Sequence, residues 1–168
     1  WPDLRAAYLR ASIKRTPAAE VDAFLLQYGA LRPARELRYR YALQLARSGN
    51  FDAYRKIYEQ FYQGREIARL DCLALQADLD AGRQDRLERL AAGLWLVGRS
   101  QVDECDPVFD HLKQQQKIGP AEHRERYQLA VEAREFGLAR WLAKSIDQSH
   151  VDEALLWQKA QSNPADFL

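Results

Sequence analysis

Apolar and small residues recur at helical spacing along most of the chain, and this periodicity restricts the folds that it can adopt. Leu87, Leu90, Ala91 and Leu94 are spaced i, i+3, i+4 and i+7, which is the pattern of one buried helix face. No segment shows the strict alternation of apolar and polar residues that is typical of a half-buried strand. The sequence therefore predicts an all-α protein of about nine or ten helices.

Proline, glycine and capping residues indicate where the helices of the first half begin and end. Pro2, Pro17 and Pro33 occupy first helical positions, and Thr16 stands before Pro17 as a candidate cap. The run Ser48-Gly49-Asn50 predicts a helix end followed at once by a helix start. Glycine favours the left-handed position after a helix, and asparagine accepts hydrogen bonds from free helical amides.

Glycine and proline also indicate where the helices of the second half begin and end. Gly82 and Gly98 are each predicted to end a helix, and Gly119-Pro120 breaks and restarts the chain. Leu129, Ala133 and Phe136 mark a further helix face that Gly137 closes. The final two helices are predicted at about 138–147 and 151–162, ending before Pro164.

A weak internal repeat accompanies these helices. Segments 42–49, 75–82 and 130–137 each mix small with apolar residues, end in glycine and precede another helix. Helix pairs that cannot bury their faces alone must stack on their neighbours. Because the glycine spacings differ and the tetratricopeptide consensus is not met, we expect an irregular right-handed α-superhelix, that is, an α-solenoid.

The composition is that of a globular domain. Of 168 residues, 47% are hydrophobic and 29% are charged, which excludes an intrinsically disordered chain. No apolar run approaches the roughly 18 residues that a membrane span needs. The chain contains no Met, so we expect either a fragment of a longer protein or a mature protein with an end removed. Residues 1–168 are expected to form a single helical-repeat domain.

Charge is distributed unevenly along the chain. Residues 1–60 carry 11 Lys and Arg against 6 Asp and Glu, whereas residues 61–168 carry 14 against 18. Much of the basic charge lies on one predicted helix, where Glu36 stands four residues before Arg40 and can form an ion pair with it. A solvated helix face is the favoured interpretation, a site for anionic peptidoglycan stems is the alternative, and no nucleic-acid partner is expected. The candidate anion or glycan contacts are Arg35, Arg38, Arg40 and Arg47.

The segment from Leu94 to Phe109 resembles a known family. It contains Leu94-Trp95-Leu96, Gly98, Ser100, then Cys105-Asp106 and Val108-Phe109, an order that is similar to the helical region of the soluble lytic murein transglycosylases. The segment 31–37, with a proline-started helix, and the segment 71–82, with Asp71-Cys72, Gln76 and Gly82, resemble further parts of that region. Val102 stands where the family pattern has a proline.

The resemblance implies a function for the whole chain. Residues 1–168 would be the superhelical, U-shaped domain of a periplasmic enzyme that cleaves peptidoglycan glycan strands, with the catalytic domain absent from this fragment. In the family this domain forms an open ring with the catalytic domain, and the ring confines glycan strands. The implied partners are peptidoglycan and the catalytic domain of the same chain. The alternative is a stand-alone helical-repeat adaptor that binds a protein in its concave groove.

The two cysteines can be interpreted either as separate thiols or as a disulfide. In helical proteins, two cysteines are most often separate buried thiols. The resemblance instead implies a disulfide between Cys72 and Cys105, because the periplasm lets disulfides persist. A metal site is not expected, since no Cys-x-x-Cys occurs and neither His111 nor His123 has ligand spacing with a cysteine.

No catalytic or cofactor-binding residues are predicted. Asn163-Pro164-Ala165 is similar to a piece of the family's active-site motif, but no Glu-Ser precedes it and no Gly-Leu-Met-Gln follows, so it is predicted to end a helix. Gly-rich phosphate loops and Ser/His/Asp sets are also missing from the sequence. The four tryptophans suggest stacking on sugars, yet at helical spacing Trp95 and Trp141 are predicted to lie in the core.

Overall fold

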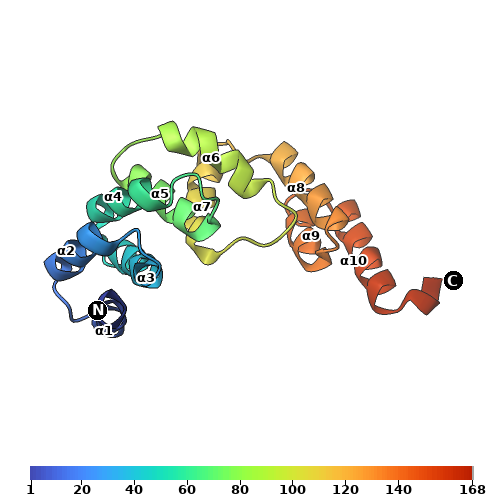
Figure 1. Ribbon diagram of the computed structural model, residues 1–168. Coiled ribbons are helices and arrows are strands. Elements are labelled where there is room, and N and C mark those ends of the chain that lie inside the picture. The colour runs from blue at the N-terminus through green and yellow to red at the C-terminus, as the bar shows by residue number, and fades with distance from the viewer. Residues whose placement is uncertain (168) are drawn as a thin grey trace. The chain divides into compact units, whose positions relative to one another are not determined.

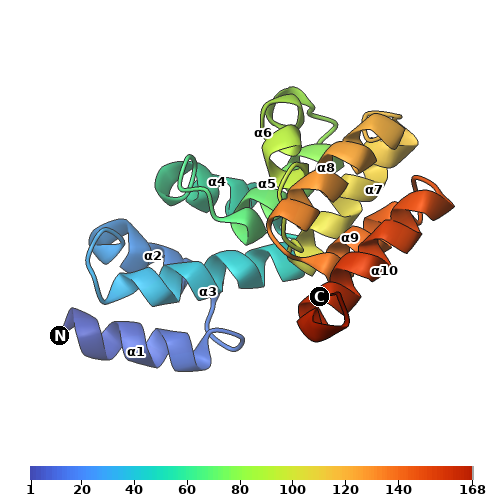
Figure 2. The same cartoon turned by 90° about the vertical axis from the view of Figure 1, so that its right-hand side faces the viewer.

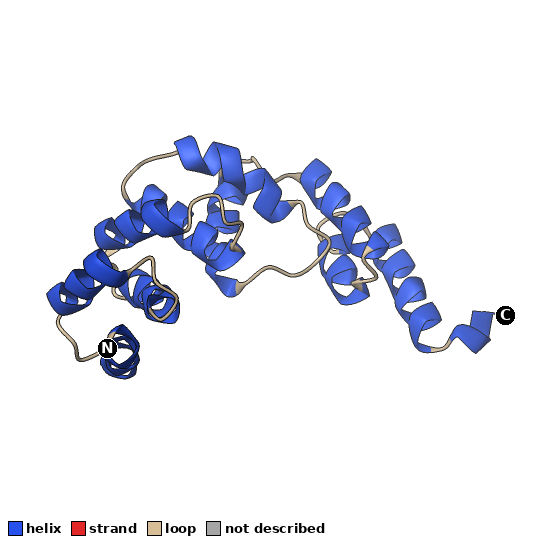
Figure 3. Ribbon diagram, viewed as in Figure 1, coloured by secondary structure: helices blue, strands red, loops and turns tan. Residues whose placement is uncertain are grey.

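The structure is a computed structural model that describes residues 1–167. Over these residues the chain forms ten α-helices and two short 3-10 helices, with no β-strand (Figure 3). The predicted all-α class and the predicted number of helices are confirmed. None of the described helices is both long and apolar enough to span a membrane. The chain divides into two compact units, Trp1–Ala81 and Gly82–Leu168.

The first unit is built around its third helix. That helix packs against the first, second and fourth helices, and the fourth packs against the fifth. Figure 2 shows α1 lying along α3. Leu9, Leu37, Tyr54, Tyr58 and Leu70 are almost completely buried and form the centre of this core. The helices are α1 (Pro2–Ser12), α2 (Ala18–Tyr28), α3 (Ala34–Arg47), α4 (Phe51–Phe61) and α5 (Ala68–Asp80).

In the second unit, α8 packs against α9 and α9 packs against α10, so that the three helices lie side by side (Figures 1 and 2). Leu87, Val108 and Leu142 are buried at its centre. Several consecutive helices are thus neighbours, namely α2 to α5 in the first unit and α8 to α10 in the second, whereas α1 packs against α3. The elements are α6 (Asp85–Trp95), η1 (Asp103–Cys105), α7 (Asp106–Gln114), α8 (Pro120–Glu132), α9 (Phe136–Ala143), α10 (Gln148–Ser162) and η2 (Pro164–Phe167).

Two predicted boundaries follow their local chemistry closely. Gly49 has a φ of 72°, the left-handed conformation expected after α3. The Asn50 side chain then accepts a hydrogen bond from the Ala53 amide at 3.4 Å and caps α4. Gly82, with a φ of 67°, ends the turn after α5 in the same way. The Ser48-Gly49-Asn50 prediction and the Gly82 prediction are confirmed.

Two other boundary predictions were wrong in detail. Pro17 is the N-cap of α2, and the Thr16 hydroxyl donates to the Ser12 carbonyl at 3.0 Å, so Thr16 closes the preceding helix instead of capping the next. Gly137 does not close a helix, because it lies in the first turn of α9. The left-handed turn after α8 is made by Arg134, whose φ is 59°. Phe136 therefore begins α9 and does not continue the face of α8.

The last two helices begin earlier than predicted. The helix predicted at about 138–147 is α9, which begins at Phe136 and ends at Ala143. The helix predicted at about 151–162 is α10, which begins at Gln148. Asp147 sets the start of α10, since its carboxylate accepts a hydrogen bond from the His150 amide at 3.0 Å.

The right-handed sense of the superhelix stays a prediction, as does the boundary of a single domain at residues 1–168.

Gly98 has a packing role that the sequence did not reveal. Helix α6 ends at Trp95, and Gly98 lies in the loop that follows. A Cβ atom at this position would collide with the Leu129 carbonyl oxygen on α8 and lie 3.0 Å from the Ala133 Cβ. The loop can therefore pass directly over α8 only because residue 98 has no side chain.

Candidate functional site

A cavity of about 500 Å³ lies within the second unit and is lined by residues of helices α6, α7, α8 and α9 and of the loop after α6. One face of α7 contributes four lining residues at spacings i, i+3, i+4 and i+7, which places them on one side of the helix. The lining combines aromatic rings with both signs of charge. Its members are Trp95, Ser100, Gln101, Asp106, Phe109, Asp110, Lys113, Arg126, Gly137, Leu138 and Trp141.

Trp95 forms the buried aromatic part of this pocket. Only 2% of its surface is exposed, so the prediction that it lies in the core is confirmed. Its indole Nε1 donates to the Glu122 carbonyl at 3.2 Å, and its ring meets Phe109 and His123 edge to face at centroid distances of 5.0 and 5.2 Å. Contacts with two other rings and a hydrogen bond hold the indole in a single orientation.

Arg126 is the buried cation of the pocket. It is 3% exposed, and its guanidinium carbon lies 4.3 Å from the Trp95 ring centroid and 5.6 Å from that of Phe109. Nη2 donates to the Arg99 carbonyl at 3.3 Å, whereas the buried Nε has no hydrogen-bond partner. Burial lowers the pKa of the Arg126 guanidinium, and the negative charge of Asp106 offsets part of this effect.

Lys113 and Trp141 form the exposed part of the pocket. The Lys113 ammonium lies 3.1 Å from the Asp110 carboxylate, 5.8 Å from the Trp95 ring centroid and 5.9 Å from that of Trp141. Trp141 is 51% exposed, so the prediction that it lies in the core was wrong. The buried face of the short helix α9 is formed instead by Phe136, Ala139, Leu142 and Ala143, which leaves the indole outside the core.

A second cavity, of about 400 Å³, shares Trp95 with the first. Its lining is more apolar and includes Leu87, Ala91, Leu112 and Ile118. It has neither an exposed aromatic ring nor a buried cation among the residues named for it. The first cavity is therefore the stronger candidate for a functional site.

The four arginines predicted as possible anion or glycan contacts all lie on α3, but they do not form one surface. Because each residue turns the helix by about 100°, positions 35 and 38 lie on a different side from positions 40 and 47. Arg38 is half-buried. It donates to the Gly29 carbonyl and to the Tyr62 hydroxyl, and its guanidinium carbon lies 4.1 Å from the Phe61 ring centroid.

The other three arginines are exposed. Arg40 is paired with Glu36 at 2.7 Å, as the i, i+4 spacing suggested. Arg35 lines a shallow charged pocket together with Arg10, Arg32 and Glu36. Arg47 lies in the last turn of α3. A glycan contact by these arginines stays a prediction, and Arg38 is already committed to packing within its own unit.

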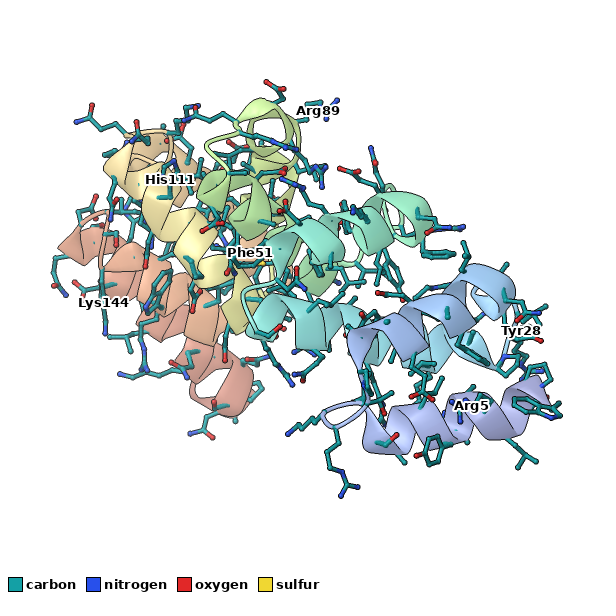
Figure 4. All side chains as sticks on the ribbon, turned by 90° about the vertical axis from the view of Figure 1, so that its left-hand side faces the viewer. Arg5, Tyr28, Phe51, Arg89, His111 and Lys144 are labelled. Carbon is teal, nitrogen blue, oxygen red and sulfur yellow. The ribbon has the colours of Figure 1, made fainter. Side chains whose placement is uncertain are left out.

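A further shallow pocket opens at one end of the first unit. Arg5 on α1 and Tyr28 at the end of α2 both line it (Figure 4). Arg5 forms an ion pair with Glu20 and lies 5.2 Å from the Tyr8 ring centroid, so its charge is already compensated. This pocket lacks the buried polar group that marks the cavity of the second unit.

The chain is similar to known proteins in both sequence and structure. The soluble lytic murein transglycosylase of Escherichia coli K12 is 28% identical over 168 residues, which is 100% of this chain and 26% of that protein. The solved structure of an inactive mutant of the lytic transglycosylase Slt from Pseudomonas aeruginosa superimposes with a TM-score of 0.81 at 30% identity, over 99% of this chain and 26% of the other.

The chain is related to the soluble lytic murein transglycosylases. The 70-kDa soluble lytic transglycosylase of Escherichia coli gives a TM-score of 0.74 at 26% identity, over 98% of this chain and 26% of that one. The resemblance seen in the sequence is thereby confirmed, while no family model matches the chain. The chain spans about a quarter of the length of these relatives.

The cysteines agree with the resemblance to the transglycosylases. Cys72 on α5 and Cys105, the N-cap of α7, are both disulfide-bonded and neither is free. They are the chain's two cysteines and are therefore bonded to each other. The predicted disulfide is confirmed.

The Glu153 carboxylate and the His150 imidazole each contact another side chain. The Glu153 carboxylate accepts from the Tyr127 hydroxyl at 3.0 Å, and the His150 ring lies 2.7 Å from the Asp147 carboxylate that caps α10. Asn163 follows the last residue of α10, so its predicted role as a helix end is confirmed. Within residues 1–167, no cluster of His, Cys, Asp and Glu could hold a metal ion.

Sequence reasoning did not single out the charged residues of the pocket. The i, i+3, i+4, i+7 spacing of Asp106, Phe109, Asp110 and Lys113 was a usable signal, since it puts polar groups and an aromatic ring on one face. Arg126 carried no comparable signal, because its burial depends on the rings of α6 and α7 that cover it.

Proposed function

We propose that this chain is a non-catalytic helical part of a bacterial peptidoglycan lytic transglycosylase that acts in the periplasm. In this proposal it helps to shape a ring that holds glycan strands for a catalytic domain elsewhere in the parent protein. The observation that carries the proposal is the extent of the match. Nearly the whole chain aligns with about a quarter of proteins named as soluble lytic transglycosylases.

The chemistry of the pocket supports a binding role over a catalytic one. A general acid that cleaves a glycosidic bond must keep its proton near neutral pH, which usually requires a carboxyl group in an apolar, buried environment. The two carboxylates of the pocket, Asp106 and Asp110, are both exposed. Asp110 is also paired with Lys113. These groups are suited to hydrogen bonding with a ligand.

The helical framework supports the structural part of the proposal. Within each unit the helices pack against one another and bury tyrosine, leucine and alanine side chains between them. The disulfide between Cys72 and Cys105 adds a covalent constraint that persists in an oxidising compartment such as the periplasm. Within each unit, packed helices of this kind can present binding groups to a long polymer without large rearrangements.

Purified peptidoglycan sacculi provide the test. The isolated chain should sediment with sacculi and release no 1,6-anhydromuropeptides, whereas a longer parent protein should release them. Release by the chain alone, above a blank, would contradict the non-catalytic role. The parent reading frame is a second check, since a Glu-Ser, Asn-Pro and Gly-Leu-Met-Gln series is expected downstream of residue 168. A parent without that series would instead support the adaptor alternative.

A further inference from the structure

The pocket of the second unit exposes a flat apolar surface beside polar groups. Trp141 is 51% exposed, although Leu142 and Ala143, which follow it on α9, are buried. An exposed indole inside a cavity is unusual, because burial of an aromatic side chain is strongly favourable. Pockets that combine aromatic walls with a few convergent polar groups are typical ligand sites. The cavity volume of about 500 Å³ suits one or two sugar-sized rings.

Arg126 provides a hydrogen-bond donor that the protein itself does not use. Arg126 is only 3% exposed and lines the cavity, and its buried Nε has no hydrogen-bond partner. Buried polar groups are nearly always hydrogen-bonded, so a guanidinium that lines a cavity and uses only Nη2 in a hydrogen bond within the protein keeps donor capacity for a ligand. The stack on Trp95 holds the guanidinium in place without satisfying its N–H groups.

The balance of charge indicates what kind of ligand fits. Two cations, Lys113 and Arg126, face two carboxylates, Asp106 and Asp110, in the same lining. A strongly ionic ligand of either sign would meet repulsion from one of these pairs. A neutral ligand with hydroxyl or amide groups can both accept from Arg126 and donate to Asp106.

Lys113 does not block the exposed indole. Its ammonium lies 5.9 Å from the Trp141 centroid, near the outer limit of a cation–π contact, and belongs to a flexible side chain. A ring stacked at van der Waals distance can displace it while Lys113 keeps its pairing with Asp110. The face of Trp141 is therefore accessible to a ligand.

We propose that this pocket is a binding site for one ring of a neutral or N-acetylated saccharide. The C–H face of the sugar lies against Trp141, its oxygen atoms accept from Arg126, and its hydroxyl or amide groups donate to Asp106. The inference deepens the proposed function, because it assigns glycan contact to named residues, and it rests on that function for its biological meaning.

Titration of the isotope-labelled chain with the tetramer of N-acetylglucosamine tests the site by NMR. The indole N–H signals of Trp141 and Trp95 should shift, whereas that of Trp1 in the other unit should not. Trp141→Ala should weaken binding at least about tenfold, since aromatic contacts contribute on the order of one factor of ten in affinity. Trp1→Ala is the matched control, because Trp1 is also exposed, at 82%.

A second pair of variants tests the acceptor. Asp106→Asn removes the charge of the first residue of α7, and Asp85→Asn does the same at the first residue of α6 outside the pocket. Only Asp106→Asn should weaken oligosaccharide binding. Thermal unfolding of each variant shows whether it is folded, and Trp141→Ala should keep its melting temperature because the indole is exposed.

Three results would overturn the site: no shift at Trp141, unchanged binding by Trp141→Ala, or binding of glucuronic acid but not of the neutral tetramer. These experiments distinguish failure of the saccharide-binding pocket from failure of the proposed function. Sacculus binding that survives with no oligosaccharide shift rejects the pocket alone. Release of anhydromuropeptides by the isolated chain rejects the non-catalytic role and leaves the pocket standing.

Discussion

The guanidinium of Arg126 rests on the ring of Trp95, with 4.3 Å between the guanidinium carbon and the ring centroid, and both side chains are almost fully buried. A buried charge without an ion pair is normally unfavourable. Here the electron-rich indole face and the Arg99 carbonyl compensate for part of the lost hydration. The pair couples α6 to α8 and forms the base of the pocket.

Replacement of this cation should therefore destabilise the protein. Arg126→Ala should lower the free energy of unfolding by about 2–4 kcal/mol, because it removes a desolvated cation–π contact, a hydrogen bond and the packing of the side-chain stem. Urea denaturation followed by circular dichroism measures the change. Arg124→Ala, at an exposed position of the same helix, is the control and should change the stability by less than about 0.5 kcal/mol. An equal loss of unfolding free energy in both variants would show that the contact between Arg126 and Trp95 does not stabilise the protein.

Gly98 and Gly93 should respond to alanine in opposite directions. A Cβ at Gly98 collides with the backbone of Leu129, so Gly98→Ala should cost about 1–3 kcal/mol of stability through overpacking. Gly93 lies within α6 and a Cβ there meets nothing within 4 Å, so Gly93→Ala should stabilise by about 0.5–1 kcal/mol. Thermal melts of the two variants beside the parent protein give the comparison. A neutral Gly98→Ala would contradict the close passage over α8.

Reduction of the disulfide should destabilise the chain. On the chain-entropy model, the loop closed between Cys72 and Cys105 contributes about 3.7 kcal/mol, less any strain in the native state. The melting temperature should fall when a reductant is added, and thiol titration of the oxidised, unfolded protein should find no free thiol. A double Cys→Ala variant serves as the control, since its melting temperature should not respond to the reductant. Two titratable thiols in oxidised protein would refute the bond.

Glu122 should make stability depend on pH in the acidic range. Its carboxylate accepts a hydrogen bond from the Gly119 amide at 2.8 Å, and hydrogen bonds from backbone amides lower the pKa of this carboxyl group. Because the folded pKa lies below the unfolded one, the contribution is present above the unfolded pKa. It is lost as the pH falls through the folded pKa. Melting temperatures at neutral pH and near pH 3 should therefore differ less for Glu122→Gln than for the parent. An identical pH slope in both proteins would contradict this role.

Several features of this protein were determined by sequence alone, because the forces behind them act within a few residues. Helical periodicity predicted an all-α chain, and Gly49 with Asn50 predicted both sides of one helix boundary. Such local rules fail where either of two nearby residues can adopt the left-handed conformation of a turn. Arg134 adopted the left-handed turn that glycine was expected to make at position 137, because the loop geometry there overrides the cost of a side chain at positive φ.

The character of the site was decided by tertiary structure. Helical spacing alone could not tell which face of α9 would be buried, so Trp141 was expected in the core and instead lies in the pocket. The same limit applies to Arg38 and Arg126, two arginines that a charge pattern treats as surface residues. Each is held by aromatic rings of other helices, Arg38 by Phe61 of α4 and Arg126 by Trp95 of α6 and Phe109 of α7. Burial depends on which surfaces meet, and that is settled by packing between helices, which a periodic pattern within one helix does not encode.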